Sequence, residues 1–300
     1  MDSIKIIDKK DPKRNKGAIP QILTEALSVS FDTNIGMDFI EDAGRRYEYY
    51  HLREDKLPFD LNFFNKITKG GLSRKTLNII LASTGVGKTM FMTHCAAHNL
   101  SSGKNVLYIT LEMAEERIAE RIDANLMDMT IDSVKELPRD YYEKKIYKIR
   151  EQTSGKLIIK EYPTSCAGSA NFRHLIQELR IKKNFIPDII YVDYLNICAS
   201  SRLKFGANVN SYTYIKSIAE ELRGLAVEFD VPIVSATQTT RSGYSNTDVG
   251  LEDTSESFGL PATADFMFAL ITSEELQGLN QIMVKQLKNR YNDPGFHQRF

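Results

Sequence analysis

Tryptophan is absent from the 300-residue sequence, and cysteine is scarce. The three cysteines, Cys95, Cys166 and Cys198, lie far apart and match neither a zinc motif nor a disulfide framework, which indicates reduced thiols in a cytosolic setting. Long apolar runs are also missing, and the first residues are polar. The sequence therefore predicts no signal peptide, no membrane anchor and a cytoplasmic protein.

A net charge is missing too. The 39 lysines and arginines balance 39 acidic residues, so any contact with nucleic acid has to come from a local patch. A hydrophobic content of 42% is enough for a sizeable core, and we expect one large domain with a small N-terminal appendage. Pro58 disfavours continuation of the helix expected over 38–52, which places the boundary between residues 1–56 and 57–300.

A glycine-containing loop from Ala82 to Thr89 is the most informative stretch that is present. It follows the apolar run Leu77–Leu81 and precedes a segment with helical spacing, the context that predicts a phosphate-binding loop. Its first position is Ala82 rather than glycine, a departure that small-residue versions of the loop tolerate. Backbone N–H groups at a helix N-terminus hold phosphates, and glycines permit the required path.

We expect this loop to bind ATP or another nucleoside triphosphate. Lys88 would neutralise the β- and γ-phosphates, and Thr89 would hold Mg²⁺. The full set of expected nucleotide contacts is Ser83, Thr84, Gly85, Val86, Gly87, Lys88 and Thr89.

Short apolar runs alternate with helical stretches along the rest of the chain. The runs lie at 105–111, 156–160, 189–192, 232–236, 266–270 and 281–285. Such strands are buried on both faces, so the pattern predicts an α/β fold with a mostly parallel central sheet flanked by helices. The clearest helix is expected over 214–229. Ligands of such sheets bind at the carboxyl ends of the strands.

Three polar residues end predicted strands and are therefore expected near the nucleotide. Asp193 would hold Mg²⁺, although a strand-end aspartate can also cap a turn. Glu112 would orient the attacking water, the alternative being a place in the first turn of the next helix. Gln238 would report on the γ-phosphate, a role that rests on its position alone because surface glutamines are common.

Basic residues at three further places are candidates for contacts with phosphate. Lys288 and Arg290 follow the last predicted strand and could stabilise a transferring phosphoryl group in a neighbouring subunit, or belong to a solvated basic turn. Two Gly-containing segments with cations, 200–208 and 239–246, could track a DNA backbone, or be ordinary loops. Their candidate residues are Arg202, Lys204, Asn208 and Arg241.

A short amphipathic helix is expected over 20–27, after a basic linker at 9–17. This helix is too short to form a hydrophobic core of its own. From periodicity alone it can fold back on its own subunit or dock on a neighbour.

In this order the motifs resemble the hexameric replicative DNA helicases with a RecA-like motor, the family that includes the bacterial DnaB type. The likeness is greatest to the T4-type bacteriophage helicases that work with a primase. It is carried by Leu57–Asp60 and Gly70–Leu72, the phosphate loop, Leu111–Met113, Val192–Leu195, Ser235–Gln238, Glu252–Ser257 with Ala264–Asp265, and Lys288–Arg290.

The resemblance implies a RecA-like phosphate-loop NTPase with an N-terminal linker helix, assembled as a hexameric ring. Such a ring moves on single-stranded DNA at the cost of ATP and unwinds duplex at a replication fork, with a primase and a helicase loader as partners. A phage-encoded chain would work in the host cytoplasm. The family's N-terminal collar is missing and its last strands are cut short at Phe300, so we expect a fragment.

Two other functions stay open. A recombinase of the same core fold would form a filament on DNA, although Lys288, Arg290 and the linker helix count against it. A non-catalytic module would use ATP only to set its shape. Glu112→Gln distinguishes that case, because in the helicase it should abolish turnover and keep nucleotide binding.

Overall fold

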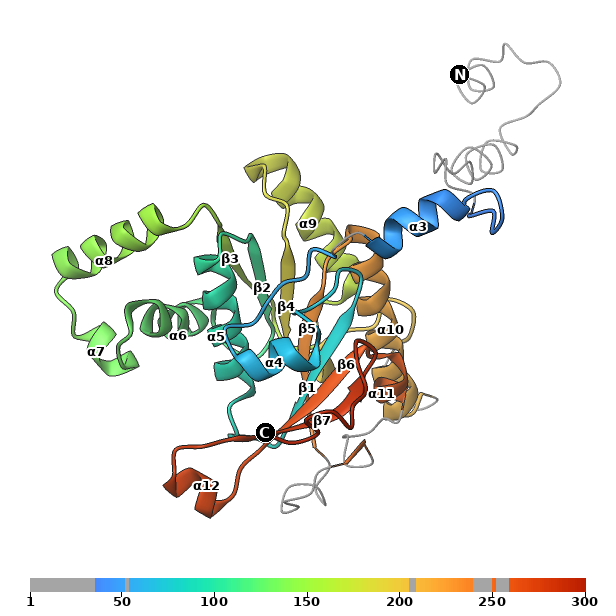
Figure 1. The fold of residues 1–300 in the computed structure, drawn as a ribbon. Helices are drawn as coiled ribbons and strands as arrows, with labels where there is room; N and C mark the ends of the chain where they lie inside the picture. Colours follow the sequence, from blue (N-terminus) through green and yellow to red (C-terminus); the bar gives the residue numbers. More distant parts are fainter. Residues whose placement is uncertain (1–35, 52–53, 205–208, 240–249, 252–258) are drawn as a thin grey trace, which may run out of the picture. The chain divides into compact units, whose positions relative to one another are not determined.

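A computed structural model describes residues 36–51, 54–204, 209–239, 250–251 and 259–300 (Figure 1). The chain divides into two compact units, Met1–Glu54 and Asp55–Phe300. In the first unit the described helix is α3 (Ala43–His51), which has no buried residue. The helix expected over 20–27 and the basic linker lie outside the described residues. Among the helices that the structure does describe, none is long and apolar enough to cross a membrane.

A seven-stranded sheet forms the centre of the second unit, with the order β3-β2-β4-β5-β1-β6-β7. The strands are β1 (Leu77–Ala82), β2 (Val106–Thr110), β3 (Leu157–Glu161), β4 (Ile189–Asp193), β5 (Ile233–Gln238), β6 (Phe266–Ile271) and β7 (Met283–Asn289). Every neighbouring pair is parallel except β6 and β7. The predicted α/β fold with a mostly parallel sheet is therefore confirmed.

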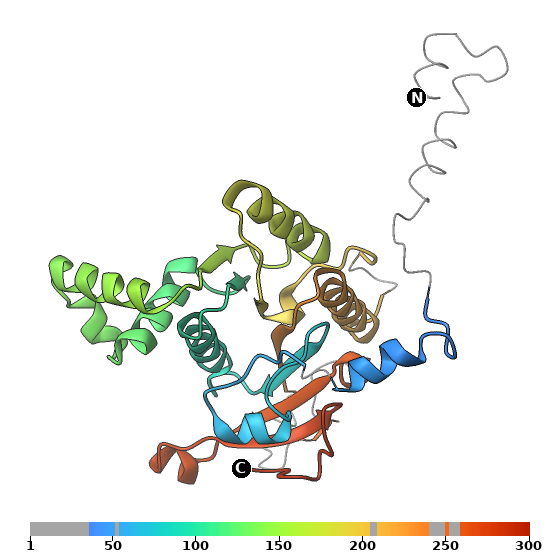
Figure 2. The ribbon, with the colours of Figure 1, turned by 45° about the horizontal axis from the view of Figure 1, so that its top comes forward.

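Helices cover both faces of the sheet, because the strands are apolar on both faces (Figure 2). The helices are α4 (Asn62–Ile67), α5 (Lys88–Ser101), α6 (Glu115–Met127), α7 (Ile131–Lys135), α8 (Arg139–Gln152), α9 (Ser169–Lys183), α10 (Ser211–Phe229), α11 (Gly259–Thr263) and α12 (Glu274–Gly278), with the 3-10 turn η2 (Leu195–Ile197). One core cluster joins the sheet to α9 and α10, and the other joins it to α4, α5 and α6.

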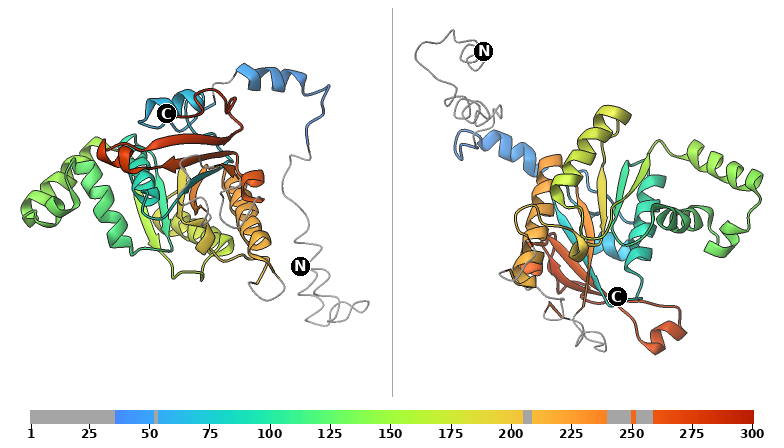
Figure 3. Two further views of the ribbon diagram at one scale, coloured as in Figure 1. Left: turned by 90° about the horizontal axis from the view of Figure 1, so that it is seen from below. Right: turned by 180° about the vertical axis from the view of Figure 1, so that it is seen from behind.

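One pair of helices departs from the α/β body. Helices α7 and α8 extend away from the sheet (Figure 3), and α8 has no buried residue. Helix α10 begins at Ser211, three residues before the predicted start, because the Asn210 side chain accepts a hydrogen bond from the Thr213 N–H and caps it.

The strand register determines which residues share an edge of the sheet. Ala82 at the end of β1 is paired with Gln238, and Thr110 at the end of β2 is paired with Asp193. The carboxyl ends of these four strands therefore meet at one edge. Because β7 runs antiparallel, its end is paired with Phe266 at the start of β6, so Asn289 lies at the opposite edge.

Candidate active site

The loop between β1 and α5 follows a path that needs glycine. Gly85 has φ +82° and Gly87, the N-cap of α5, has φ +112°, both in the left-handed region. Neither glycine has a close neighbour that a Cβ would strike, so the backbone angle, rather than space, is the constraint. The loop therefore reaches the N-terminus of a 14-residue helix in the conformation expected of a phosphate-binding loop.

Lys88 begins α5 and is almost fully buried. Its ammonium group donates to the carbonyl oxygens of Ala82 and Ser83, each at 3.2 Å. Burial lowers the pKa of Lys88, while the negative charges of Glu112 and Asp193 raise it. The predicted phosphate-binding lysine therefore lies close to both predicted acidic residues.

Asp193 ends β4 with only 1% of its surface exposed. Its Oδ2 accepts a hydrogen bond of 3.1 Å from the Tyr108 hydroxyl, while Oδ1 is buried and has no hydrogen-bond partner among the described residues. Burial raises the pKa of Asp193, and the side chains of Thr89 and Tyr108 oppose that shift.

An orphaned buried carboxylate oxygen beside a threonine hydroxyl is a donor set that fits Mg²⁺, a cation that prefers oxygen ligands. The predicted pair Thr89 and Asp193 is therefore brought together.

Glu112 is exposed and lies just beyond β2, at the same edge of the sheet as Asp193. Helix α6 begins at Glu115, so Glu112 lies outside its first turn. The Thr110 hydroxyl bonds both the N–H and the carbonyl of Met113 and fixes the turn that carries Glu112. This placement leaves Glu112 free of the helix-start role that was its alternative.

Gln238 ends β5 next to the loop. Its side-chain amide donates to the Tyr194 hydroxyl at 3.2 Å, and Tyr194 directly follows Asp193. The hydroxyls of Ser83 and Thr239 are 2.8 Å apart, which ties the loop to the end of the same strand. The loop is thus linked to the end of β5 through Thr239, the residue that follows Gln238.

Lys288 and Arg290 lie at the other edge of the sheet, away from the loop of their own chain. The Arg290 guanidinium is 2.7 Å from Asp265 and half exposed, and Asp265 is shared with Arg223. The Lys288 ammonium donates to the carbonyls of Pro261 and Ala262, and its burial lowers its pKa. Both cations are held at the amino-terminal edge, where they do not join the loop in one site.

The predicted DNA contacts are only partly described. The Arg202 guanidinium pairs with Glu220 and Glu221, and Lys204 is exposed two residues further on. Asn208 and Arg241 lie outside the described residues.

Sequence reasoning missed three residues that hold predicted site residues in place. Tyr108 bonds Asp193, Asp265 pairs with Arg290, and Glu221 pairs with Arg202. Tyr108 had a signal, since a hydroxyl-bearing ring in a buried aliphatic strand needs a partner. It stacks on Tyr191 of the neighbouring strand with ring centroids 5.7 Å apart. Glu221 gave no signal, because a glutamate in a helix is usually solvated.

Known proteins share this sequence and architecture. The chain is 47% identical over 296 residues to the DnaB-like replicative helicase of Enterobacteria phage T4, covering 96% of this chain and 62% of that protein. It is 30% identical over 229 residues to a probable plasmid replicative DNA helicase of Chlamydia psittaci, covering 73% of this chain and 48% of that one. The chain thus spans less than two thirds of either relative.

Solved structures share the fold. A DnaB-like replicative helicase studied for its interactions with primase superposes with a TM-score of 0.66 at 20% identity, covering 95% of this chain and 68% of that one. A solved ATPase domain superposes with a TM-score of 0.68 at 19% identity, covering 86% of this chain and 93% of the domain. Residues 57–291 match the family described as DnaB-like helicase C terminal domain. Because this match covers most of the sequence, the chain belongs to the DnaB-like helicase C-terminal domain family.

Proposed function

We propose that the chain is the motor of a replicative DNA helicase, which hydrolyses ATP or another nucleoside triphosphate, moves along single-stranded DNA and unwinds duplex at a replication fork. One observation carries the proposal. Lys88, Thr89 and the buried Asp193 converge at one edge of the sheet, with one Asp193 oxygen unpartnered among the described residues, in a chain of the DnaB-like family.

Each residue at this edge has a proposed task. The loop from Ser83 to Thr89 binds the phosphates through its N–H groups, and Lys88 neutralises their charge. Thr89 and Asp193 hold Mg²⁺, which, when bound, offsets the charge that develops on the phosphoryl oxygens. Glu112 orients the attacking water and accepts its proton, and Gln238 senses the γ-phosphate.

Lys288 and Arg290 are proposed to complete the site of a neighbouring subunit. They lie at the edge opposite their own loop, so they serve a nucleotide only if a second copy presents its loop to them. This supports a homo-oligomer, and we propose a hexameric ring with residues 1–56 as linker and docking helix and 57–300 as motor. We expect the ring to work in the host cytoplasm, with a helicase loader as a partner.

DNA is proposed to contact the segments that follow β4 and β5, through Arg202, Lys204, Asn208 and Arg241. Both strands end at the edge that carries the loop. A primase is a proposed partner as well, because one solved DnaB-like helicase is described with its primase interactions.

The test is ATP hydrolysis with and without single-stranded DNA, in the wild type and in Glu112→Gln. We expect DNA to stimulate the wild type, and Glu112→Gln to lower turnover about 100-fold or more with nucleotide binding intact. Glu115→Gln, in the first turn of α6, is the matched control and should hydrolyse normally. Equal turnover in Glu112→Gln and the wild type would contradict the role of Glu112. Nucleotide binding without hydrolysis in the wild type would favour the non-catalytic module.

Electron microscopy with nucleotide and DNA separates the remaining alternative. Closed rings support the helicase, and helical filaments would support the recombinase.

A further inference from the structure

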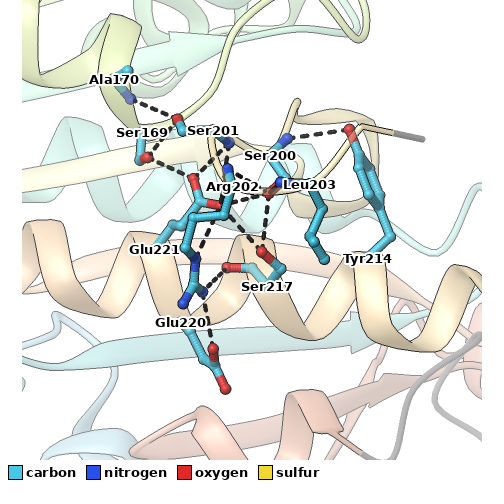
Figure 4. Close-up of polar contacts among 10 residues, drawn as sticks. All are labelled: Ser169, Ala170, Ser200, Ser201, Arg202, Leu203, Tyr214, Ser217, Glu220 and Glu221. Atoms are coloured by element: carbon cyan, nitrogen blue, oxygen red, sulfur yellow. Dashed lines mark hydrogen bonds and ion pairs between the residues drawn. The ribbon is translucent and has the colours of Figure 1, made fainter. Parts of the chain in front are cut away.

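Glu221 lies in the middle of α10, and its side chain is only 7% exposed. Its carboxylate is the centre of a group of hydrogen bonds with two serine-rich segments and its own helix (Figure 4). Burying a carboxylate costs free energy unless hydrogen bonds replace those it makes with water, so a buried Glu221 requires several hydrogen-bond donors around it.

Those contacts come from three elements. The hydroxyls of Ser200, Ser169 and Ser217 donate to Glu221 at 2.6, 2.7 and 3.1 Å. Ser169 begins α9, Ser217 lies one turn before Glu221 in α10, and Ser200 belongs to the segment after η2. One side chain therefore joins two helices and the segment after η2.

Main-chain groups add to this set. The Ser201 N–H donates to both carboxylate oxygens at 2.9 and 3.1 Å, and the Arg202 N–H donates at 3.3 Å. The Ser200 hydroxyl in turn accepts from the N–H groups of Arg202 and Leu203 at 3.2 and 3.0 Å. Glu221 thus fixes the backbone of residues 200–203, and not only their side chains.

The carboxylate is held in its charged form. Burial alone would raise the pKa of Glu221, but the hydrogen bonds from Ser200, Ser169 and the N–H groups of Ser201 and Arg202 outweigh burial and lower it to about 2. A charged acceptor forms stronger hydrogen bonds than a neutral one, so the ionised carboxylate holds the backbone of residues 200–203 more strongly than a neutral side chain would.

Residues 200–203 begin the first segment proposed to contact DNA. The chain enters that segment from β4, whose end carries Asp193, and leaves it into α10. The position of Lys204 depends on how the backbone leaves Ala199. That exit is what Glu221 controls.

We propose that Glu221 is a positioning residue, which sets the backbone of residues 200–203 so that Arg202 and Lys204 meet single-stranded DNA in one conformation. The inference rests on the proposed function, because that function makes the segment a DNA contact. In this proposal Glu221 acts through the backbone that it holds, and not by direct contact with nucleotide or DNA.

Glu220 provides a matched control. It is adjacent in sequence and pairs with the same Arg202 guanidinium at 2.9 Å, yet it is 41% exposed and its ion pairs are with the side chains of Arg202 and Lys216. If restraint of the Arg202 charge were what matters, Glu220→Gln and Glu221→Gln would behave alike. If the backbone of 200–203 matters, only Glu221→Gln has an effect.

The experiment measures three quantities on the full chain: amide hydrogen exchange at residues 201–203, the basal rate of ATP hydrolysis, and the concentration of oligo(dT) that gives half-maximal stimulation. For Glu221→Gln we expect faster exchange, an unchanged basal rate and an oligo(dT) requirement raised about tenfold, the loss of roughly one charged hydrogen bond. For Glu220→Gln all three should stay near wild type. Ser200→Ala, a milder change to the same contacts, should give an intermediate result and serves if Glu221→Gln folds poorly.

Unchanged exchange in Glu221→Gln, or faster exchange with an unchanged oligo(dT) requirement, would overturn the inference. An equal rise in that requirement for Glu220→Gln would overturn it too. A wild-type chain whose hydrolysis ignores oligo(dT) would instead contradict the proposed function, so the two failures are distinguishable.

Discussion

The two oxygens of the Asp193 carboxylate have different surroundings. Oδ2 is occupied by the Tyr108 hydroxyl, and Oδ1 has no hydrogen-bond partner among the described residues. The Tyr108 hydroxyl thereby fixes the rotation of the carboxylate and leaves Oδ1 as the proposed ligand of Mg²⁺. Supporting partners of this kind orient metal ligands in many proteins.

Tyr108→Phe removes this hydrogen bond and keeps the ring stacked on Tyr191. We expect the Mg²⁺ concentration for half-maximal hydrolysis to rise about three- to tenfold, as for the loss of one hydrogen bond. Mn²⁺ binding followed by electron paramagnetic resonance checks the metal affinity directly. Tyr191→Phe is the control, because its hydroxyl bonds Asn99 and not Asp193. An equal Mg²⁺ requirement in both variants would contradict the positioning by Tyr108.

Glu221 gives the protein a dependence on pH. Its pKa is about 2 in the folded chain against an ordinary value of 4.5, so its contribution to stability is complete above pH 4.5 and is lost as the pH falls toward 2. The difference in free energy of unfolding between wild type and Glu221→Gln should be constant near neutral pH and shrink between pH 4.5 and 2. Urea unfolding across that range measures it, and a difference that grows on acidification would refute the assignment.

Among the secondary-structure elements, α9 and the segment after η2 meet at an unusually close backbone contact. Gly168, the N-cap of α9, forms a parallel bridge with Ala199, and a Cβ built on it would lie 1.8 Å from the Ala199 carbonyl oxygen. This contact brings Ser169 within reach of Glu221. Glycine is therefore required at position 168 for space, while its backbone angles are ordinary.

Gly168→Ala should destabilise the fold by about 1–3 kcal/mol, because the methyl group has to push two backbones apart. Gly224→Ala is the matched control in α10, where a Cβ would meet nothing within 4 Å. That change should stabilise the chain by about 0.5–1 kcal/mol. Thermal unfolding of both variants checks the pair, and the same direction of change in both would contradict the close contact.

Most strands and the nucleotide loop could be predicted from the sequence because their signals are local. The run Ile189–Asp193 is apolar up to its last residue, and Ala82–Thr89 contains its own turn chemistry. The helix over 214–229 was predicted to start late because its Asn210 cap lies outside the apolar stripe. The antiparallel direction of β7 depends on its partner strand and has no local signal.

The candidate site was predictable only in part. Residues that end strands, such as Glu112 and Gln238, could be placed at one edge because parallel strands share their direction. Partners distant in sequence could not be found: Asp265 lies 25 residues before Arg290, and Tyr108 lies 85 residues before Asp193. Such pairs are set by tertiary packing, which a single sequence does not display.

At the scale of the whole molecule, the separation of the loop from Lys288 and Arg290 predicts complementation. Lys88→Ala and Arg290→Ala should each be inactive in DNA-stimulated hydrolysis. A mixture of the two should recover part of the activity, because some boundaries then combine an intact loop with an intact arginine. Arg223→Ala, which removes another Asp265 ion pair, is the control for loss of that contact and should stay active on its own. An inactive mixture would contradict the shared site.

If the site is shared as proposed, the placement of the nucleotide loop and Arg290 at opposite edges of the sheet also sets how many reaction centres an assembly holds. An open row of copies arranged head to tail has one loop without a neighbouring Arg290 at one end, and one Arg290 without a neighbouring loop at the other. In the proposed ring, joining those termini would complete the last centre, so closure would add one ATPase site through one more interface of the same kind. A gap between two subunits of the ring, wide enough to admit a DNA strand, would inactivate the ATPase site at that one boundary and leave the other sites active.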